Sequence, residues 1–289
     1  MPELPEVETV RRGLEKYFVG HIIEDIDIKK PKIFQGDKKN ITGAKVVAVK
    51  RFGKGLVIDL SNKYSMAIHI KLTGQLIYRG KDEPHVIHTD LKRVGNTLPN
   101  PWTHVIFHLD RGATLYYNDI RQFGWIKVVP TEKVSGLPFF KDLGPEFPLV
   151  SDSGQARMTE KMFGEVLSKS KIAIKPLIMD QKKMSGLGNI YANDGLYLAK
   201  IDPKRPAYSL TSKEIKSLYS AILEVLNKGL KEGGASELTF VNVLGESGNY
   251  QNHSLVYGKN GQKCKRDGTI IKRIMLGGRG TFFCPTCQK

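Results

Sequence analysis

The chain is poor in cysteine, short of acidic residues and without any long apolar run. Only 3 of its 289 residues are cysteine, which excludes the disulfide framework that stabilises small secreted domains. No apolar stretch approaches the roughly 20 residues that a membrane-spanning helix needs, and none has the form of a signal peptide. We therefore expect a cytoplasmic protein, long enough for two domains with separate cores.

Basic residues outnumber acidic residues in this chain. Lys and Arg total 45 against 29 Asp and Glu, a net charge of +16, and residues 250–289 hold eight basic side chains and one acid, Asp267. Such a charge favours a polyanionic partner. Nucleic acid is preferred to an anionic membrane, because no basic amphipathic helix with a broad apolar face is visible. A merely solvated basic surface is the alternative for the charge run taken alone.

Strand signals dominate residues 1–131. An amphipathic helix is expected at the N-terminus. Short apolar, β-branched runs separated by turn signals follow it, at residues 44–51, 56–60, 64–70, 75–79, 103–109, 113–118 and 121–129. Runs at this spacing are typical of antiparallel strands. The pattern predicts an N-terminal domain over residues 1–131, mostly β behind one initiating helix.

Helical periodicity replaces the strand pattern after a Pro- and Gly-rich stretch, which predicts a linker over residues 132–150. One predicted helix places four apolar residues on one face: Met162, Phe163, Val166 and Leu167. Another begins at Thr211 and Glu214, which have capping-box spacing, and is stopped by Gly233–Gly234. A helical domain is expected over residues 151–249.

The three cysteines lie together near the C-terminus. Cys284-Pro-Thr-Cys287 is one ligand pair with two intervening residues, and Cys264-Lys-Arg-Asp267 has the same spacing with Asp in the last place. Two such pairs on two β-turns are typical of a zinc ribbon, and carboxylate oxygen is an accepted zinc ligand. The pattern predicts two short hairpins over residues 250–289 and one structural zinc per chain. A zinc-free ribbon held by packing is the alternative.

Four stretches, in the same order, resemble the formamidopyrimidine-DNA glycosylases. They are PELPEVET at 2–9, DIRQFG at 119–124, SGLGNIYAND at 185–194 and RGTFFCPTCQK at 279–289, which together span nearly the whole chain. The resemblance implies an α+β fold with an N-terminal β-sandwich and initiating helix, a helix–two-turn–helix domain and a C-terminal zinc-ribbon β-hairpin. It also implies a monomer that binds double-stranded DNA containing oxidised bases or abasic sites.

The same resemblance implies a nucleophile at the start of the chain. Removal of Met1 leaves Pro2 with a free secondary amine, whose protonated form a helix N-terminus disfavours. In the family this amine attacks the sugar C1′ of a flipped-out nucleotide, expels the base through an iminium intermediate and cuts the backbone by elimination. Glu3 is implied as general acid/base and Glu6 as a supporting carboxylate. Complementarity to the helix dipole is the alternative explanation for both acids.

Further DNA contacts follow from the resemblance. Phosphate binding beside the lesion is implied for Lys54 and Arg279, and we group these two with the catalytic residues. Phosphate binding is also implied for Asn189. Filling the hole left by the flipped base is implied for Leu72, Arg121 and Phe123, with the arginine facing the orphaned cytosine. Each of these residues also has an ordinary structural use, as a solvated turn lysine, a turn asparagine or a core apolar side chain.

The match departs from the family pattern at two positions. Asp267 replaces an expected Cys. Leu238 stands where Lys or Arg is common, within residues 233–251, which correspond to the loop that covers the flipped base. Within the family that the chain resembles, the form PELPE favours oxidised purines, such as 8-oxoguanine and formamidopyrimidines, so the resemblance implies a bifunctional glycosylase and abasic-site lyase of base-excision repair. An endonuclease VIII-like enzyme for oxidised pyrimidines and a non-catalytic binder of damaged DNA are the alternatives.

Overall fold

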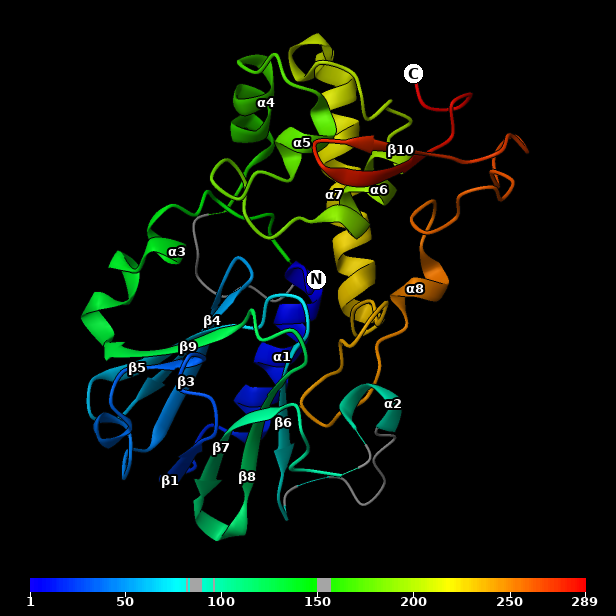
Figure 1. Ribbon diagram of the computed structural model, residues 1–289. Coiled ribbons are helices and arrows are strands. Elements are labelled where there is room, and N and C mark those ends of the chain that lie inside the picture. Colours follow the sequence, from blue (N-terminus) through cyan, green and yellow to red (C-terminus); the bar gives the residue numbers. More distant parts are fainter. Residues whose placement is uncertain (82, 84–89, 96, 150–156) are drawn as a thin grey trace. The chain divides into compact units, whose positions relative to one another are not determined.

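The computed structural model describes residues 1–81, 83, 90–95, 97–149 and 157–289, and the chain forms two compact units (Figure 1). Unit 1 comprises Met1–Lys141 and Leu230–Gln251, and unit 2 comprises Asp142–Gly229 and Asn252–Lys289. The expected boundary between residues 150 and 151 lies outside the described residues. Among the helices of the described ranges, none is long and apolar enough to cross a membrane.

Unit 1 begins with helix α1 (Leu4–Tyr17), which starts after the N-cap residue Glu3. Its core-facing side chains, Val7, Val10 and Leu14, are at most 1% exposed. They recur at the spacing of one helix face, so burial of that face holds the helix in place. The expected N-terminal helix is confirmed.

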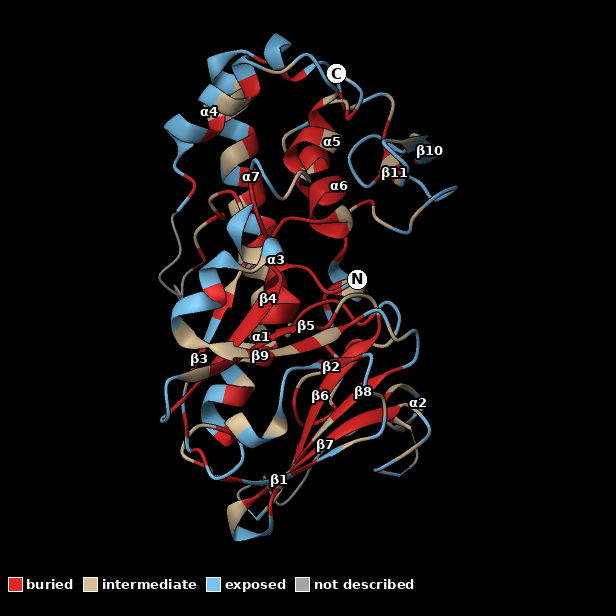
Figure 2. Cartoon of the chain, turned by 60° about the vertical axis from the view of Figure 1, so that its left-hand side comes forward, coloured by how far each residue is buried: buried red, intermediate tan, exposed pale blue. Residues whose placement is uncertain are grey.

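Two sheets form the β-sandwich of unit 1. The first sheet has the order β1 (Ile23–Ile28), β7 (Thr103–Leu109), β8 (Thr114–Asp119) and β6 (Gly74–Arg79). The second has the order β2 (Phe34–Gln35), β9 (Trp125–Pro130), β5 (Tyr64–His69), β4 (Gly55–Leu60) and β3 (Val46–Phe52). All pairs are antiparallel except β2–β9. Side chains of both sheets and of α1 share one core, and Figure 2 shows strands such as β4 and β8 largely buried.

Short helical turns complete unit 1. They are η1 (Lys38–Asn40), α2 (Leu91–Val94), η2 (Asp110–Gly112), η3 (Thr131–Gly136) and α3 (Pro138–Lys141). The expected linker therefore begins as ordered structure, and the ring of Phe140 packs edge-on against Phe52 at a centroid distance of 5.9 Å. Its Pro and Gly residues delimit short helices, and aromatic burial attaches them to the sandwich.

Helices are the main regular elements of unit 2. They are α4 (Glu160–Ser168), α5 (Ile174–Ile178), α6 (Asn189–Leu198), η4 (Ala207–Ser209) and α7 (Ser212–Lys231), and α7 and α8 (Tyr250–His253) both run across the division between the units. The capping box is present, because the Thr211 N–H donates to Glu214 Oε2 at 2.8 Å. The four apolar residues expected on one face of α4 are buried to different extents: Phe163 and Leu167 are buried, whereas Met162 is 38% exposed.

The C-terminal ribbon holds one regular hairpin, formed by β10 (Lys272–Leu276) and β11 (Arg279–Phe283). The second expected hairpin is reduced to a single bridge between Lys263 and Ile270. A backbone hydrogen bond from the Cys264 N–H to the Thr269 carbonyl at 2.7 Å joins the same two segments. The expectation of two hairpins is therefore half right.

Candidate functional site

The start of α1 holds two buried carboxyl groups next to Pro2. Pro2 is buried, and Glu3 and Glu6 are 2% and 1% exposed. The Glu6 carboxylate accepts from the backbone N–H of Glu3 at 2.7 Å and from that of Ala235 at 2.8 Å. Glu6 thus fixes Glu3 at the helix start and attaches residues 235 onward to the same place.

Lys54 lies in the turn between β3 and β4 and is 4% exposed, so it is no ordinary solvated turn lysine. Its turn is tied to α1 through Arg51, whose guanidinium donates to Glu8 Oε2 at 2.9 Å and to the Gly53 carbonyl at 3.1 Å. Burial acts to raise the pKa of Glu8, but hydrogen bonds and charges from Arg11 and Arg51 outweigh it and lower that pKa. A buried ion pair therefore sets the position of the Lys54 turn relative to α1.

A buried aspartate, Asp119, joins the two loops that carry the predicted hole-filling residues. Its carboxylate accepts from the Thr73 hydroxyl in the β5–β6 loop. It also accepts from the backbone N–H groups of Arg121 at 3.2 Å and Gly124 at 2.8 Å in the β8–β9 loop. Leu72 directly precedes Thr73. The three predicted residues are therefore carried by two loops with one common anchor.

Arg121 and Phe123 are both exposed, Phe123 by 53%, and the guanidinium lies 5.0 Å from the centre of the ring. Gly124 closes the loop where no side chain fits, because a Cβ there would lie 1.8 Å from the Tyr117 hydroxyl. Sequence reasoning missed Asp119, although it is the first residue of the DIRQFG motif. The available signal was an acid at a strand end directly before a loop of functional residues.

His69 is a second residue that sequence reasoning missed. It is 4% exposed, and its Nδ1 accepts from the Lys71 N–H at 2.9 Å, which requires an unprotonated nitrogen. Burial lowers the pKa of His69 to about 3, and the charges of Lys71 and Lys54 act in the same direction. Lys71 has a left-handed backbone (φ 49°), unusual for a non-glycine residue. His69 therefore supports, as a neutral side chain, the strained loop that carries Leu72.

In unit 2 a buried lysine joins Asn189, the first residue of α6, to the ribbon. Lys175 is 1% exposed, and its Nζ donates to Asn189 Oδ1 and Thr281 Oγ1, both at 2.7 Å, and to the Gly280 carbonyl at 3.1 Å. The Asn189 amide also donates to that carbonyl at 3.1 Å. Arg279 is exposed at the start of β11, so the predicted Asn189 and Arg279 belong to one connected structure. Lys175 was missed, although a lysine inside the apolar stretch IKPLI was a visible signal.

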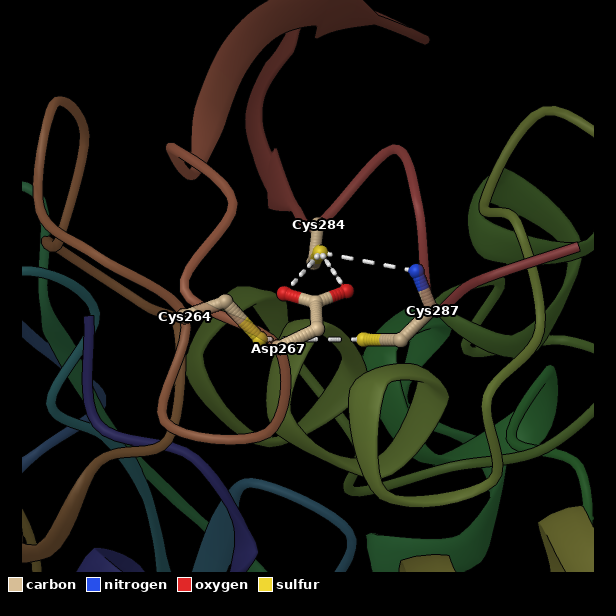
Figure 3. Close-up of side chains that lie close together, drawn as sticks. All are labelled: Cys264, Asp267, Cys284 and Cys287. Atoms are coloured by element: carbon tan, nitrogen blue, oxygen red, sulfur yellow. Dashed lines mark hydrogen bonds between the residues drawn. The ribbon is translucent and has the colours of Figure 1, made fainter.

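The four predicted zinc ligands converge in the ribbon (Figure 3). The ligand atoms of Cys264, Asp267, Cys284 and Cys287 all lie within 4.8 Å of one another. The sulfurs of Cys264 and Cys287 are 3.7 Å apart, and Cys284 Sγ lies 3.4 and 3.5 Å from the Asp267 oxygens. Bonds of about 2.3 Å to sulfur and 2.0 Å to oxygen give tetrahedral edges of about 3.8 and 3.5 Å. The cluster fits a single structural zinc.

The electrostatics of the cluster agree with this assignment. Burial, together with the neighbouring Cys284 and Cys264, raises the pKa of Cys287 to about 12. The Thr269 backbone hydrogen bond leads the causes that lower the pKa of Asp267. A bound cation reverses the effect of crowding on the thiols, because it stabilises thiolates. The donor set thus suits a divalent cation.

The architecture has three parts: a β-sandwich with an initiating helix, a helical unit and a zinc ribbon. Comparison with known proteins identifies the family that has this architecture. Residues 1–126 match the formamidopyrimidine-DNA glycosylase N-terminal domain, residues 148–240 its H2TH domain, and residues 261–289 a zinc finger found in FPG and IleRS. The chain belongs to the formamidopyrimidine-DNA glycosylase family.

Relatives match over their full length. The formamidopyrimidine-DNA glycosylases of Pelotomaculum thermopropionicum and Lactiplantibacillus plantarum are each 40% identical, over 100% of this chain and 99% and 100% of theirs. Lactococcus lactis Fpg in complex with abasic-site DNA superposes with a TM-score of 0.84, at 36% identity over 99% of both chains. A complex of wild-type L. lactis Fpg with DNA containing an oxidised pyrimidine has a TM-score of 0.82, at 37% identity over 100% of both chains.

Proposed function

We propose that this protein is a bifunctional DNA glycosylase and abasic-site lyase of base-excision repair, acting on oxidised purines such as 8-oxoguanine and formamidopyrimidines. The observation that carries the proposal is the start of α1, where Pro2 is followed by buried Glu3 and Glu6 in a chain of this family. A free amine at a helix N-terminus is a suitable neutral nucleophile.

The proposed reaction begins once Met1 has been removed. The Pro2 nitrogen attacks C1′ of the flipped nucleotide, and the bond from C1′ to the base breaks with its electron pair leaving on the base, which is protonated. Opening of the sugar ring produces an iminium ion. Loss of a C2′ proton then expels the 3′ phosphate, a second elimination expels the 5′ phosphate, and water releases Pro2. Glu3 is proposed to transfer the protons, and Glu6 to hold Glu3 in place.

DNA binding is assigned to the basic side chains and loops described above. We assign phosphate contacts to Lys54, Asn189 and Arg279, and filling of the vacated base position to Leu72, Arg121 and Phe123. The exposed Arg121 guanidinium is suited to the acceptors of an orphaned cytosine. Binding through several phosphates should weaken steeply as salt rises, because counterions are released on binding.

The remaining assignments follow from the same proposal. The zinc of the ribbon has a structural role, because its four ligands leave no open position. The protein acts as a cytoplasmic, nucleoid-associated monomer. Its proposed segments are a catalytic β-sandwich domain at 1–131, a linker at 132–150, a helix–two-turn–helix domain at 151–249 and a ribbon at 250–289.

Excision of oxidised pyrimidines is a second candidate activity. The similar L. lactis Fpg has been crystallised with DNA containing an oxidised pyrimidine. Leu238, within the segment expected to cover the flipped base, is 60% exposed. An apolar side chain adds no donor specific to a purine, so this segment favours oxidised purines less than a basic one would.

Borohydride trapping tests the proposal. Mature protein is mixed with an 8-oxoguanine:cytosine duplex or an abasic-site duplex, and the crosslink is located by mass spectrometry. We expect an adduct at Pro2 that is absent in Pro2→Gly and strongly reduced in Glu3→Gln on the 8-oxoguanine duplex. Glu15→Gln, on an exposed position of the same helix, is the control and should behave like the wild type.

The two substrates separate the alternatives. Trapping on the abasic duplex without release of 8-oxoguanine, followed by release of dihydrothymine, would favour the oxidised-pyrimidine activity. Tight binding of both duplexes with no adduct, in protein shown to lack Met1, would contradict the proposed chemistry and leave a non-catalytic DNA binder.

A further inference from the structure

The segment of residues 235–240 begins next to Glu6, at the start of α1. Ala235 donates its N–H to the Glu6 carboxylate, and a few residues later two backbone carbonyls of the same segment point at one arginine. Arg93 Nη2 donates to the Ser236 carbonyl at 2.8 Å, and Arg93 Nε donates to the Leu238 carbonyl at 2.9 Å. The segment is thus held at its start by Glu6 and along its length by Arg93, a residue of the short helix α2.

Arg93 is itself held in position by several partners. Its guanidinium pairs with Asp90, which accepts from the Ser247 hydroxyl at 2.7 Å and donates its N–H to the Gly245 carbonyl at 2.8 Å. The Gln75 amide from β6 donates to the Arg93 carbonyl at 2.8 Å and to the Thr239 carbonyl at 2.6 Å. Arg93 and Gln75 together therefore contact the segment both before and after Leu238.

An apolar contact adds to these hydrogen bonds. Val94 of α2, Ile77 of β6 and Val241, the residue directly after the segment, form a small buried cluster. The Leu238 side chain, by contrast, is 60% exposed although its carbonyl is fixed. A fixed backbone that presents an exposed apolar side chain three residues after Ala235, the residue that contacts Glu6, is suited to contact a planar base.

We propose that Arg93 is a positioning residue for base excision, which pre-orders residues 235–240 so that Leu238 packs on the damaged base. Ordering a loop costs conformational entropy, and a clamp present before binding removes that cost from the step in which the base enters the site. This inference rests on the proposed function. It also predicts different effects on base release and on strand cleavage at an abasic site, because an abasic nucleotide has no base for residues 235–240 to cover.

The test compares both reactions in the same variants. Arg93→Met keeps the side-chain stem but removes the guanidinium donors, and Arg93→Lys keeps the charge. Lys92→Met, the exposed neighbour in α2, is the matched control for loss of one positive charge. Single-turnover release of 8-oxoguanine and strand cleavage at a preformed abasic site are measured. If the wild type releases only an oxidised pyrimidine, a dihydrothymine duplex replaces the 8-oxoguanine duplex.

We expect Arg93→Met to slow base release by about tenfold to a hundredfold, because a small misplacement of a positioning group has effects of this size. Cleavage at the abasic site should be unchanged, Arg93→Lys should lie between the two, and Lys92→Met should match the wild type. Equal loss in both reactions would show a merely structural role and overturn the inference, as would unchanged base release. A wild type inactive on every duplex would instead contradict the proposed function.

Discussion

The two units organise their predicted DNA-contacting residues with buried charges of opposite sign. In unit 1 the buried charges are carboxylates: Asp119 and Glu6 accept hydrogen bonds from backbone N–H groups, and Glu8 pairs with the Arg51 guanidinium. In unit 2 the buried ammonium of Lys175 collects oxygen atoms of Asn189, Gly280 and Thr281.

At these sites the difference follows from the polar groups that must be satisfied. Helix starts and the β8–β9 loop offer N–H groups, which need acceptors, whereas the start of β11 presents a carbonyl, which needs a donor. Elsewhere in unit 2 the buried Asp194 carboxylate also accepts from backbone N–H groups, those of Leu255 and Val256. A buried charge is tolerated in both cases because it is paired or hydrogen-bonded. We expect the cost of removing it to depend on whether a charged or a neutral partner remains.

The largest effect is expected for Arg51→Met in unit 1. This change removes the most deeply buried guanidinium from the Glu8 carboxylate and the donor to the Gly53 carbonyl, while Arg11 still pairs with Glu8, so the free energy of unfolding should fall by about 3 kcal/mol. Urea unfolding followed by tryptophan fluorescence measures it selectively, because Trp102 and Trp125 both lie in unit 1.

Arg12→Met is the control for Arg51→Met. Arg12 also pairs with Glu8, at 3.2 Å, but its side chain is 44% exposed, so its loss should cost at most about 1 kcal/mol. Similar losses for both variants would contradict the view that the buried pair holds the Lys54 turn.

A smaller loss is expected for Lys175→Met in unit 2. The acceptors left behind at Asn189, Gly280 and Thr281 are uncharged, so the cost should be about 1.5–3 kcal/mol. Hydrogen exchange of the α6 and β11 amides measures it. Salt-dependent DNA binding should weaken in parallel, and unchanged exchange at β11 would show that Lys175 does not join the ribbon to α6.

The third effect depends on pH. Folded His69 has a pKa lowered to about 3, mainly by burial, whereas in the unfolded chain its pKa lies near the ordinary 6.5. The unfolded state therefore binds more protons as the pH falls through 6.5. This residue should lower the free energy of unfolding by about 2 kcal/mol between about pH 8 and pH 5.

The His69 contribution is isolated by subtraction. His69→Gln lacks this titration, so its unfolding free energy, followed by tryptophan fluorescence, should decline less steeply than that of the wild type over the same pH range. Parallel pH profiles would contradict a neutral, buried His69.

The smallest effect on the fold is expected for Asp267→Cys. A fourth thiolate should slow removal of zinc by a chelator roughly tenfold while leaving the unfolding of unit 1 unchanged. Metal analysis should give one zinc per chain for both proteins. Well under one equivalent in the wild type would contradict the zinc site.

Local sequence patterns predicted much of the fold. The cysteine pairs predicted the zinc cluster, the Thr211 and Glu214 pair predicted the start of α7, and alternating apolar runs predicted seven strands of the sandwich. Patterns did not predict two details: Met162 belongs to the apolar stripe of α4 but is exposed, and a single bridge at Lys263 stands where a hairpin was expected. A periodic pattern indicates a face without stating how much of it a neighbour covers.

The sequence by itself determined the order of the β-rich, helical and ribbon regions, the metal-ligand spacing and the family, because each depends on residues close together in the chain or on motifs recognised one at a time. Only the tertiary structure decided which partners the buried charges meet: Asp119 meets Thr73, and Lys175 meets Thr281. The physical reason is that a charge can be buried only when its partners arrive from another segment, and the distance between such segments appears only after the chain has folded.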